Sequence, residues 1–408
     1  MKLPNSLLNV LRNILLVLMG IVVALLVVEG ASRLLDLPYD YDPQYRCDHL
    51  FGWVGTPNSN LKVKTDDYKH FVTRNSRGMH DEEHALEKPD GVFRILVLGD
   101  SFAEAREVDE PKTSHQILED RLNASAPDGL RFEVVLGGVR GWGPAQEYLY
   151  LREVGIKYQP DLVLAFWLPK NDLQDLLPDY RCTKAGINCY APYFAICDGT
   201  FDPEPWFSAP GIAPTLRTCS PVKKQLTNIL SWVYYHSRLY QYLERSTVYM
   251  HPRAKIEPWW LPWVDQAAAE RMDTYDNLVY GYQITEELYD QLLNTTAQSG
   301  AQAVIAIIPT KEIVLAEAFP AYRQEMSDAP LVNRISDTSR PNKLLKAMLA
   351  PTRVPILDLL PAFVNRSLES DEPLYWEEDG HWTEAGNQFA GETIANWLVE
   401  QGLVPAAN

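Results

Sequence analysis

A serine and a histidine in this sequence lie where a folded chain would expose them for chemistry. Ser101 follows the apolar run 93–98, which is rich in β-forming residues and ends at Gly99 and Asp100. A serine between a strand and a helix exposes its Oγ, and its backbone N–H points at a developing oxyanion. The alternative is an ordinary turn or helix-capping serine. The tripeptide by itself leaves both interpretations open.

His381 lies in an acidic loop just ahead of the helix predicted at 383–401. A serine hydroxyl needs a base to take its proton, and a carboxylate that accepts from the Nδ1–H of that base fixes its tautomer. Asp379 and Glu378 are both within reach of the ring. A loop histidine beside acids is otherwise an ordinary solvated pair. His381 is therefore the candidate base for Ser101.

The elements that would position these residues alternate between strand and helix. Strands are predicted at 93–98, 132–136, 160–166, 303–308 and 354–357, and helices at 113–123, 144–154, 265–298 and 383–401. Such alternation predicts an α/β fold of three layers, α/β/α, around a mostly parallel sheet. Ligands of these folds bind at the carboxyl ends of the strands. The residues expected at this edge are Ser101, Gly141, Asn171 and the 379–381 loop.

Two stretches interrupt the alternation. Residues 39–90 are rich in Pro, Asn, Asp and Tyr and show little periodicity, which indicates an extended segment lying against the main body. Residues from about 174 to 262 form a predicted insertion rich in Cys, Pro and Trp. Its aromatic side chains could stack on sugar rings, but simple packing is the preferred interpretation.

The cysteines indicate disulfides. Cys182, Cys189, Cys197 and Cys219 cluster within the insertion, while Cys47 stands apart. Two local disulfides are expected, with the pairing open because Cys47 could replace any member. A zinc site is the weaker alternative, since the short C-x2-4-C pairs of zinc modules are missing from the sequence. No metal or cofactor is expected.

The N-terminus carries a candidate membrane anchor. Residues 14–28 are uninterrupted apolar residues, and a span of about 20 residues results if the helix runs from Leu8 to Val28. Lys2 and Arg12 lie before the apolar core, which places the N-terminus in the cytoplasm and the body outside. A cleaved signal peptide is the competing interpretation. The expected organisation is a stub and anchor at 1–38, a juxtamembrane segment at 39–90 and a main domain at 91–405.

The composition excludes one class of partner. The formal net charge is −17, and the sequence has no stretch rich in Lys and Arg. Phosphate backbones need a basic surface, so no nucleic acid partner is expected. Phosphate-binding motifs of the GxxxxGKS type are likewise missing, which removes support for phosphoryl transfer.

Four short blocks resemble the SGNH hydrolases, also called the GDSL-like family. In the family's order they are Gly99-Asp100-Ser101-Phe102, Gly138-Val139-Arg140-Gly141-Trp142-Gly143, Lys170-Asn171-Asp172 and Asp379-Gly380-His381. The resemblance covers roughly residues 91–400 with the insertion set aside. It implies a flavodoxin-like sheet in a membrane-anchored, bacterial-type member. The string Asp-Gly-His-Trp-Thr is also similar to the alginate O-acetyltransferase branch of this clan.

The resemblance implies a role for each matched residue. Ser101 would be the nucleophile, His381 the base and Asp379 the acid that orients it. The oxyanion would be bound by the Ser101 N–H, the Gly141 N–H and the Asn171 amide. Three departures from the family pattern are Pro169 for the third block's glycine, Leu136 for the second block's asparagine, and an acid two residues before the histidine. Glu378 stands three residues before it and stays open as the triad acid.

The implied function is that of a serine esterase, acting through an acyl-enzyme on acylated glycans or other esters outside the cytoplasm. An O-acetyltransferase of an exported polysaccharide shares every step up to the acyl-enzyme and differs only in the acceptor. A catalytically inactive glycan-binding protein of the same fold is the third alternative, which the departures at Pro169 and Leu136 make conceivable.

Overall fold

The computed structural model describes residues 5–35, 44–169, 171–176, 191–208, 221–241, 272–328 and 340–406. Its centre is a five-stranded sheet in the order β11-β10-β7-β5-β6, with every pairing parallel. The strands are β5 (Val92–Gly99), β6 (Arg131–Gly138), β7 (Leu162–Trp167), β10 (Gln302–Ile307) and β11 (Ile356–Asp358). If these strands are numbered 1 to 5 in chain order, their order across the sheet is 2-1-3-4-5, which is the flavodoxin-like order. The predicted fold class is therefore confirmed.

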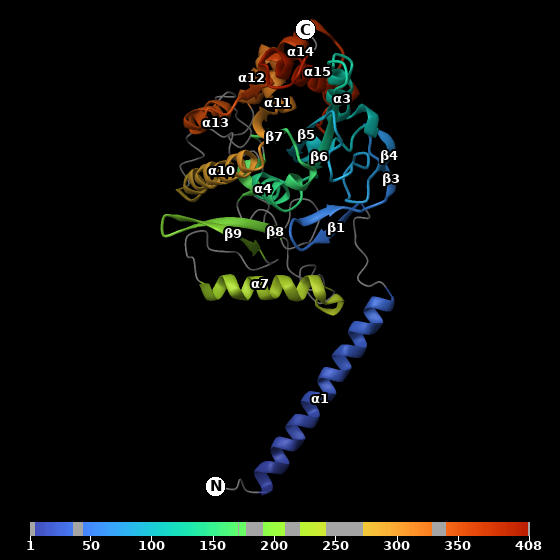
Figure 1. Ribbon diagram of the computed structural model, residues 1–408. Helices are drawn as coiled ribbons and strands as arrows, with labels where there is room; N and C mark the ends of the chain where they lie inside the picture. The colour runs from blue at the N-terminus through green and yellow to red at the C-terminus, as the bar shows by residue number, and fades with distance from the viewer. Residues whose placement is uncertain are drawn as a thin grey trace.

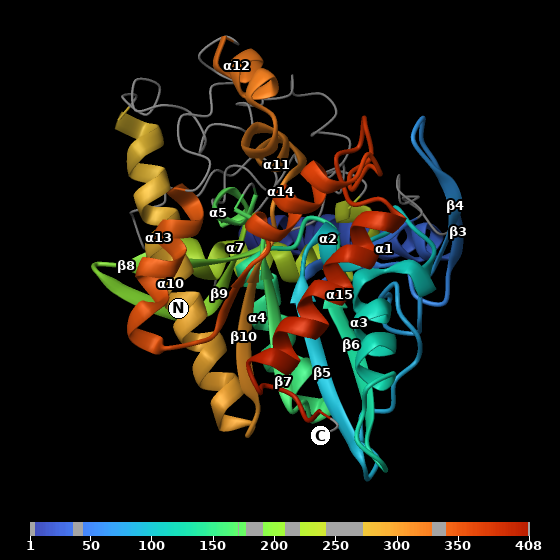
Figure 2. The same ribbon diagram turned by 90° about the horizontal axis from the view of Figure 1, so that it is seen from above.

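Helices cover both faces of this sheet, as the three-layer prediction requires. Figure 1 shows α4 and α10 on the side of the sheet nearer α1, with α3, α14 and α15 on the opposite side. The helices of the main body are α2 (Ser101–Glu104), α3 (Ser114–Asn123), α4 (Pro144–Glu153), α5 (Asp172–Asp175), α10 (Met272–Gln298), α11 (Lys311–Ala318), α12 (Pro320–Asp328), α13 (Arg340–Leu349), α14 (Leu360–Glu369) and α15 (Glu384–Glu400). Figure 2, seen from above, shows α3 beside α15 along β5 and β6.

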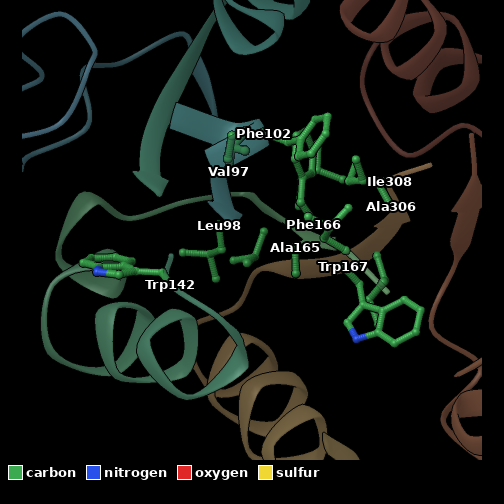
Figure 3. Close-up of a cluster of buried hydrophobic side chains, with 14 of the residues drawn as sticks. Val97, Leu98, Phe102, Trp142, Ala165, Phe166, Trp167, Ala306 and Ile308 are labelled. Atoms are coloured by element: carbon green, nitrogen blue, oxygen red, sulfur yellow. The ribbon is translucent and has the colours of Figure 1, made fainter. Parts of the chain in front are cut away.

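The central strands are buried on both faces, which explains why they read as continuous apolar runs. Residues 95–98 of β5 and 162–167 of β7 are at most 3% exposed. Figure 3 shows Val97 and Leu98 of β5 near Ala165, Phe166 and Trp167 of β7. This core holds the sheet rigid, and the ends of β5 and β7 therefore have fixed positions.

The predicted extended segment contains two short antiparallel hairpins within residues 44–90. The strands are β1 (Tyr45–Asp48), β2 (Gly52–Gly55), β3 (Asn60–Lys64) and β4 (Lys69–Thr73). Polar and apolar residues alternate along β3, a period-2 pattern that the sequence analysis did not use. Tyr45, Phe51 and Trp53 are buried in the main core, so this segment packs against the body as predicted.

The predicted insertion is described only in part. Its described elements are β8 (Ala191–Cys197) and β9 (Thr200–Ser208), which form an antiparallel hairpin, and α7 (Pro221–His236). Cys47 and Cys197 each take part in a disulfide. Cys182, Cys189, Cys219 and the aromatics Trp259, Trp260 and Trp263 lie outside the described residues. The expected pairing of the cysteines stays a prediction.

The N-terminal helix α1 (Asn5–Leu34) extends the predicted apolar helix in both directions. Within its segment Asn9–Leu34, the most apolar stretch of 18 residues has a mean hydropathy of 2.8 and is not buried, so the length and composition of the helix suffice to cross a membrane. Figure 1 shows α1 projecting away from the body.

Candidate active site

Ser101 is the first residue of α2 and follows directly on the carboxyl end of β5. The close approach of α2 to the sheet depends on two glycines. A Cβ added at Gly99 would lie 2.8 Å from the Cβ of Ala103, and one added at Gly138 would lie 2.9 Å from it. The expected strand, turn and helix around Ser101 are therefore present. The serine itself is buried at 5% exposure.

His381 and Asp379 reach Ser101 from the opposite end of the chain. The Nε2 atom of His381 lies 2.8 Å from Ser101 Oγ. The Nδ1 atom of the same ring hydrogen-bonds Asp379 Oδ1. The structure thus brings together a hydroxyl, an imidazole and a carboxylate in the order that a nucleophile, base and orienting acid require.

The loop that carries both residues is fixed at its two ends. Trp376 N donates to His381 O at 2.8 Å, and the loop closes as a β-bridge between Tyr375 and Trp382. Thr383 then caps α15 by accepting from Gly386 N. Within this loop Glu378 is exposed, whereas Asp379 is partly buried and bonded to the histidine. The geometry favours Asp379 over Glu378 as the acid.

Two residues of the β3–β4 hairpin support Asp379, and the sequence analysis missed both. Tyr68 OH donates to Asp379 Oδ2 at 2.8 Å. Asp67 Oδ2 accepts from the backbone N–H of Asp379 at 2.7 Å and from that of Glu378 at 2.9 Å. These partners are about three hundred residues away in the chain. Local sequence carries no signal for such contacts.

We expect Tyr68→Phe to lower kcat/KM about tenfold. A hydrogen bond to a charged group contributes about 1.5–3 kcal/mol, and part of this free energy serves to hold the Asp379 carboxylate in place. The measurement is the rate of p-nitrophenol release from p-nitrophenyl acetate. Tyr280→Phe is the matched control, since among the described residues the Tyr280 hydroxyl accepts from Ile196 N in the β8 hairpin, away from Asp379. Equal rates for the two variants would contradict a positioning role for Tyr68.

A second carboxylate, Glu107, faces the histidine. Its Oε1 lies 3.8 Å from His381 Nδ1, and its side chain is almost fully buried. Burial lowers the pKa of His381, but the charge of Glu107 and the hydrogen bond to Asp379 outweigh burial and raise this pKa to about 9. Burial raises the pKa of Asp379, but its bonds to His381 and Tyr68 bring it down to about 2. Burial also raises the pKa of Glu107.

These shifts predict an alkaline pH profile. A base acts in its neutral form, and a histidine with a pKa of about 9 is protonated below that pH, so kcat/KM should rise as pH increases toward 9. Glu107→Gln removes the largest charge that raises this pKa, and the rise should then move to lower pH. Profiles of both proteins between about pH 5 and 10 test this. An unchanged midpoint in Glu107→Gln would rule out the role of its charge.

The expected oxyanion residues lie on the loops after β6 and β7. Gly141 has φ of 76°, a conformation that favours glycine. Asn171 Nδ2 donates to Asp100 Oδ2 at 3.0 Å, and an amide nitrogen carries a second hydrogen that can donate elsewhere. The other oxygen of Asp100 accepts from Phe102 N at 2.9 Å. Asp100 thus links the loop of Asn171 to the helix that begins at Ser101.

Glu104, the last residue of α2, is a buried carboxylate that accepts hydrogen bonds from three segments of the chain, and the sequence analysis did not identify it. It accepts from Tyr45 OH at 3.0 Å, from Arg74 Nη2 at 2.5 Å and from the backbone N–H of Arg140 at 2.8 Å. Arg140 directly precedes Gly141. The β1 hairpin and the stretch after β4 are therefore tied to the predicted oxyanion loop.

Two of the three departures from the family pattern, Leu136 and Pro169, lie in well-defined local surroundings. Leu136 is buried inside β6, and its backbone N–H donates to Asp81 Oδ2 at 2.8 Å. Pro169 stands in the turn between β7 and α5, where Asn171 N donates to Leu168 O at 3.2 Å. Proline has no backbone N–H to donate, but this turn is closed by the N–H of Asn171 and therefore still forms.

Among the described residues, one group has atoms close enough to bind a metal ion: Glu107, Asp379 and His381, whose ligand atoms lie within 4.8 Å of one another. Both ring nitrogens of His381 already take part in hydrogen bonds, to Ser101 and to Asp379. A metal ligand needs one ring nitrogen for the ion, so the arrangement fits a triad better than a metal site.

Known proteins provide an independent comparison. Residues 270–407 match a family model described as the SGNH hydrolase-like domain of acetyltransferase AlgX. This range includes Asp379 and His381 but begins after Ser101. A comparison with curated proteins finds no match.

Solved structures with some similarity include an acetyl xylan esterase, AlAXEase, at 10% identity and a TM-score of 0.36, covering 75% of this chain and 99% of that one. Axe2, an acetylxylan esterase from Geobacillus stearothermophilus crystallised as a catalytic mutant, has 14% identity and a TM-score of 0.37, with 78% and 97% covered. TesA has 11% identity and a TM-score of 0.36, with 76% and 99% covered. These scores are too low to support an argument. The family match confirms the predicted resemblance to the SGNH hydrolases, with similarity to the AlgX acetyltransferase branch.

Proposed function

We propose that this protein is a serine-dependent enzyme that handles acyl esters, with Ser101 as nucleophile, His381 as base and Asp379 as orienting acid. The observation that carries the proposal is the continuous contact from Asp379 Oδ1 through the His381 ring to Ser101 Oγ. The SGNH hydrolase-like match of residues 270–407 supports acyl-ester chemistry as the reaction class.

In the first half-reaction Ser101 Oγ attacks the ester carbonyl carbon while His381 Nε2 takes the hydroxyl proton. The carbonyl oxygen becomes an oxyanion, and the N–H groups of Ser101 and Gly141 with the Asn171 amide would stabilise it. The C–O bond to the alcohol then breaks. His381 returns its proton to the leaving oxygen, and the acyl group stays on Ser101.

In the second half-reaction the oxygen of an acceptor hydroxyl attacks the acyl carbon while His381 Nε2 takes its proton. The bond from the acyl carbon to Ser101 Oγ then breaks, His381 returns the proton to that oxygen, and the acyl group leaves on the acceptor. Water as acceptor makes the enzyme an esterase, which is the leading proposal. A sugar hydroxyl makes it an O-acetyltransferase, and the description of the matched family as acetyltransferase AlgX favours this second candidate. An acylated glycan is the proposed substrate of the esterase and the proposed product of the transferase.

The helix α1 is the proposed membrane anchor, with the body on the extracytoplasmic side. The helix contains a strongly apolar stretch that is not buried, and Lys2 and Arg12 lie toward its N-terminal end. The proposed division of the chain is 1–38 for the stub and anchor, 39–90 for the juxtamembrane segment and 91–405 for the catalytic domain.

The test uses the full chain in detergent micelles, with p-nitrophenyl acetate as donor and with or without an added oligosaccharide. Release of p-nitrophenol that depends on Ser101 and ignores the sugar supports an esterase. Acetylated sugar detected by mass spectrometry, with release accelerated by the acceptor, supports a transferase. Labelling by a serine-directed fluorophosphonate separates both from the third alternative. A wild-type chain that releases no product and resists labelling would be an inactive binding protein.

A further inference from the structure

The polarity of the two faces of helix α7 is the reverse of that of a helix on a soluble surface, because polar side chains face the body and apolar side chains face outward. Its face toward the body carries Thr227, Ser231 and Tyr234, which are at most 5% exposed. The opposite face carries an apolar stripe, Val222, Leu226, Ile229 and Trp232, in which every side chain is between 52% and 74% exposed. The stripe residues are spaced four, three and three apart, which places them along one side of the helix.

This arrangement is costly in water. Small polar side chains are buried, whereas two branched aliphatic residues, a leucine and a tryptophan are presented outward along about three helical turns. Scattered apolar residues are normal on a surface, but a contiguous apolar stripe marks a surface that contacts something else. The neighbourhood of α7 shows what that is.

The C-terminal end of α7 is joined to the end of α1. Arg33 Nη2 donates to the carbonyl of His236, the last residue of α7, at 2.6 Å. One carboxylate, that of Glu29, accepts from Ser237 Oγ at 2.9 Å and from the backbone N–H groups of Arg238 and Leu239 at 3.1 and 3.0 Å. Figure 1 shows α7 lying crosswise between the body and α1.

These contacts fix the level of α7 along α1. Glu29 and Arg33 belong to the last two turns of the apolar span Asn9–Leu34. If α1 crosses a bilayer, this end lies where the chain leaves the hydrocarbon, and α7 then lies at the same level. The orientation also fits, because the stripe faces away from the body.

We propose that α7 is an amphipathic helix that lies in the interface of the membrane leaflet at the outer end of α1, with the apolar stripe in contact with lipid. The proposal rests on the membrane anchor proposed for α1. Trp232 suits this position, because tryptophan is enriched where bilayer meets water. The geometry favours lipid over a second copy of the chain, since the anchor already holds the stripe at the bilayer surface.

A basic cleft lies beside this junction. The cavity measures about 470 Å³, and its lining includes Arg33, Arg46 and Arg238 together with Asp48. Basic side chains at the level of the headgroups attract anionic lipid phosphates. The body would thus be held against the membrane by an anchor, an apolar stripe and a cationic cleft, which leaves it little freedom to rotate about α1.

The experiment places an environment-sensitive fluorescent amino acid at position 229 of the full chain, in nanodiscs of phosphatidylcholine and phosphatidylglycerol. The matched control has the same probe at position 368 in α14, where Leu368 is equally 58% exposed. Figure 1 shows α14 on the far side of the body from α1. We expect the probe at 229 to shift to the blue and to be quenched severalfold by lipids brominated on their acyl chains. The probe at 368 should show neither change.

The outcomes separate this proposal from the anchor. A probe at 229 that behaves like the one at 368, in a chain that resists carbonate extraction from membranes, overturns the lipid contact and leaves the anchor standing. A probe at 229 that is protected from brominated lipid in discs holding two chains overturns it in favour of a second copy. Extraction of the chain by carbonate contradicts the anchor itself, and this proposal falls with it.

Discussion

Ser101→Ala is expected to lower kcat/KM on p-nitrophenyl acetate by at least about a thousandfold, because removal of a triad nucleophile costs several powers of ten even when the rest of the site is intact. Alanine has no Oγ, so no acyl-enzyme can form. The fold should survive, since the site packs around the backbone of α2 and the side chain lost is small. Fluorophosphonate labelling, detected as a mass increase of the intact chain, should disappear at the same time.

Ser114→Ala is the matched control for this experiment. Ser114 is a second buried serine at a helix start, 1% exposed, and its Oγ lacks a hydrogen-bond partner among the described residues. We expect its substitution to leave rate and labelling unchanged. If Ser101→Ala still binds the fluorophosphonate, the nucleophile is another residue and the proposed mechanism is wrong.

The sheet could be predicted because its strands have an unusually clear signature. Strands β5, β6 and β7 are covered on both faces, so selection for burial acts on consecutive residues and not on alternate ones. The residues that follow these strands could be found for the same reason, since parallel strands end at one edge. This is how Ser101, Gly141 and Asn171 could be found without a structure.

The supporting residues could not be found in this way. Tyr68 and Asp67 reach Asp379 from a hairpin whose strands have five residues each, and Glu104 joins segments that are far apart in sequence. Such contacts depend on how the hairpin packs against the body. Sequence periodicity reports only which face of one element is buried, and it carries no information about which elements meet.

The hairpin of the insertion could not be predicted because both of its strands contain proline. Pro192 lies in β8, and Pro203 and Pro205 lie in β9, where a proline ordinarily argues against a strand. Both strands belong to a two-stranded sheet, so each has an edge whose N–H groups need no partner strand. The rule that excludes proline from central strands therefore does not apply here.

Asp379→Asn is expected to lower kcat/KM by about ten-thousandfold, the scale of loss when a triad acid becomes an amide and the histidine tautomer is wrong. The carboxylate oxygen that now accepts from Nδ1–H would be replaced by a group that can turn its NH2 toward the ring. The His381 ring would then no longer present an unprotonated Nε2 to Ser101 Oγ, with which it forms a hydrogen bond of 2.8 Å. The test is again release of p-nitrophenol, across a range of pH.

Glu378→Gln is the decisive comparison, because it removes the neighbouring carboxylate by the same chemical change. The Glu378 side chain is exposed and only its backbone N–H is held, by Asp67 Oδ2 at 2.9 Å, so this variant should stay within about twofold of wild type. A large loss in Glu378→Gln together with a small loss in Asp379→Asn would mean that the loop rearranges before catalysis and brings Glu378 to the ring. Losses of similar size in both would mean that the two acids act as one unit. The side-chain bonds of Asp379 to His381 and Tyr68 argue against this.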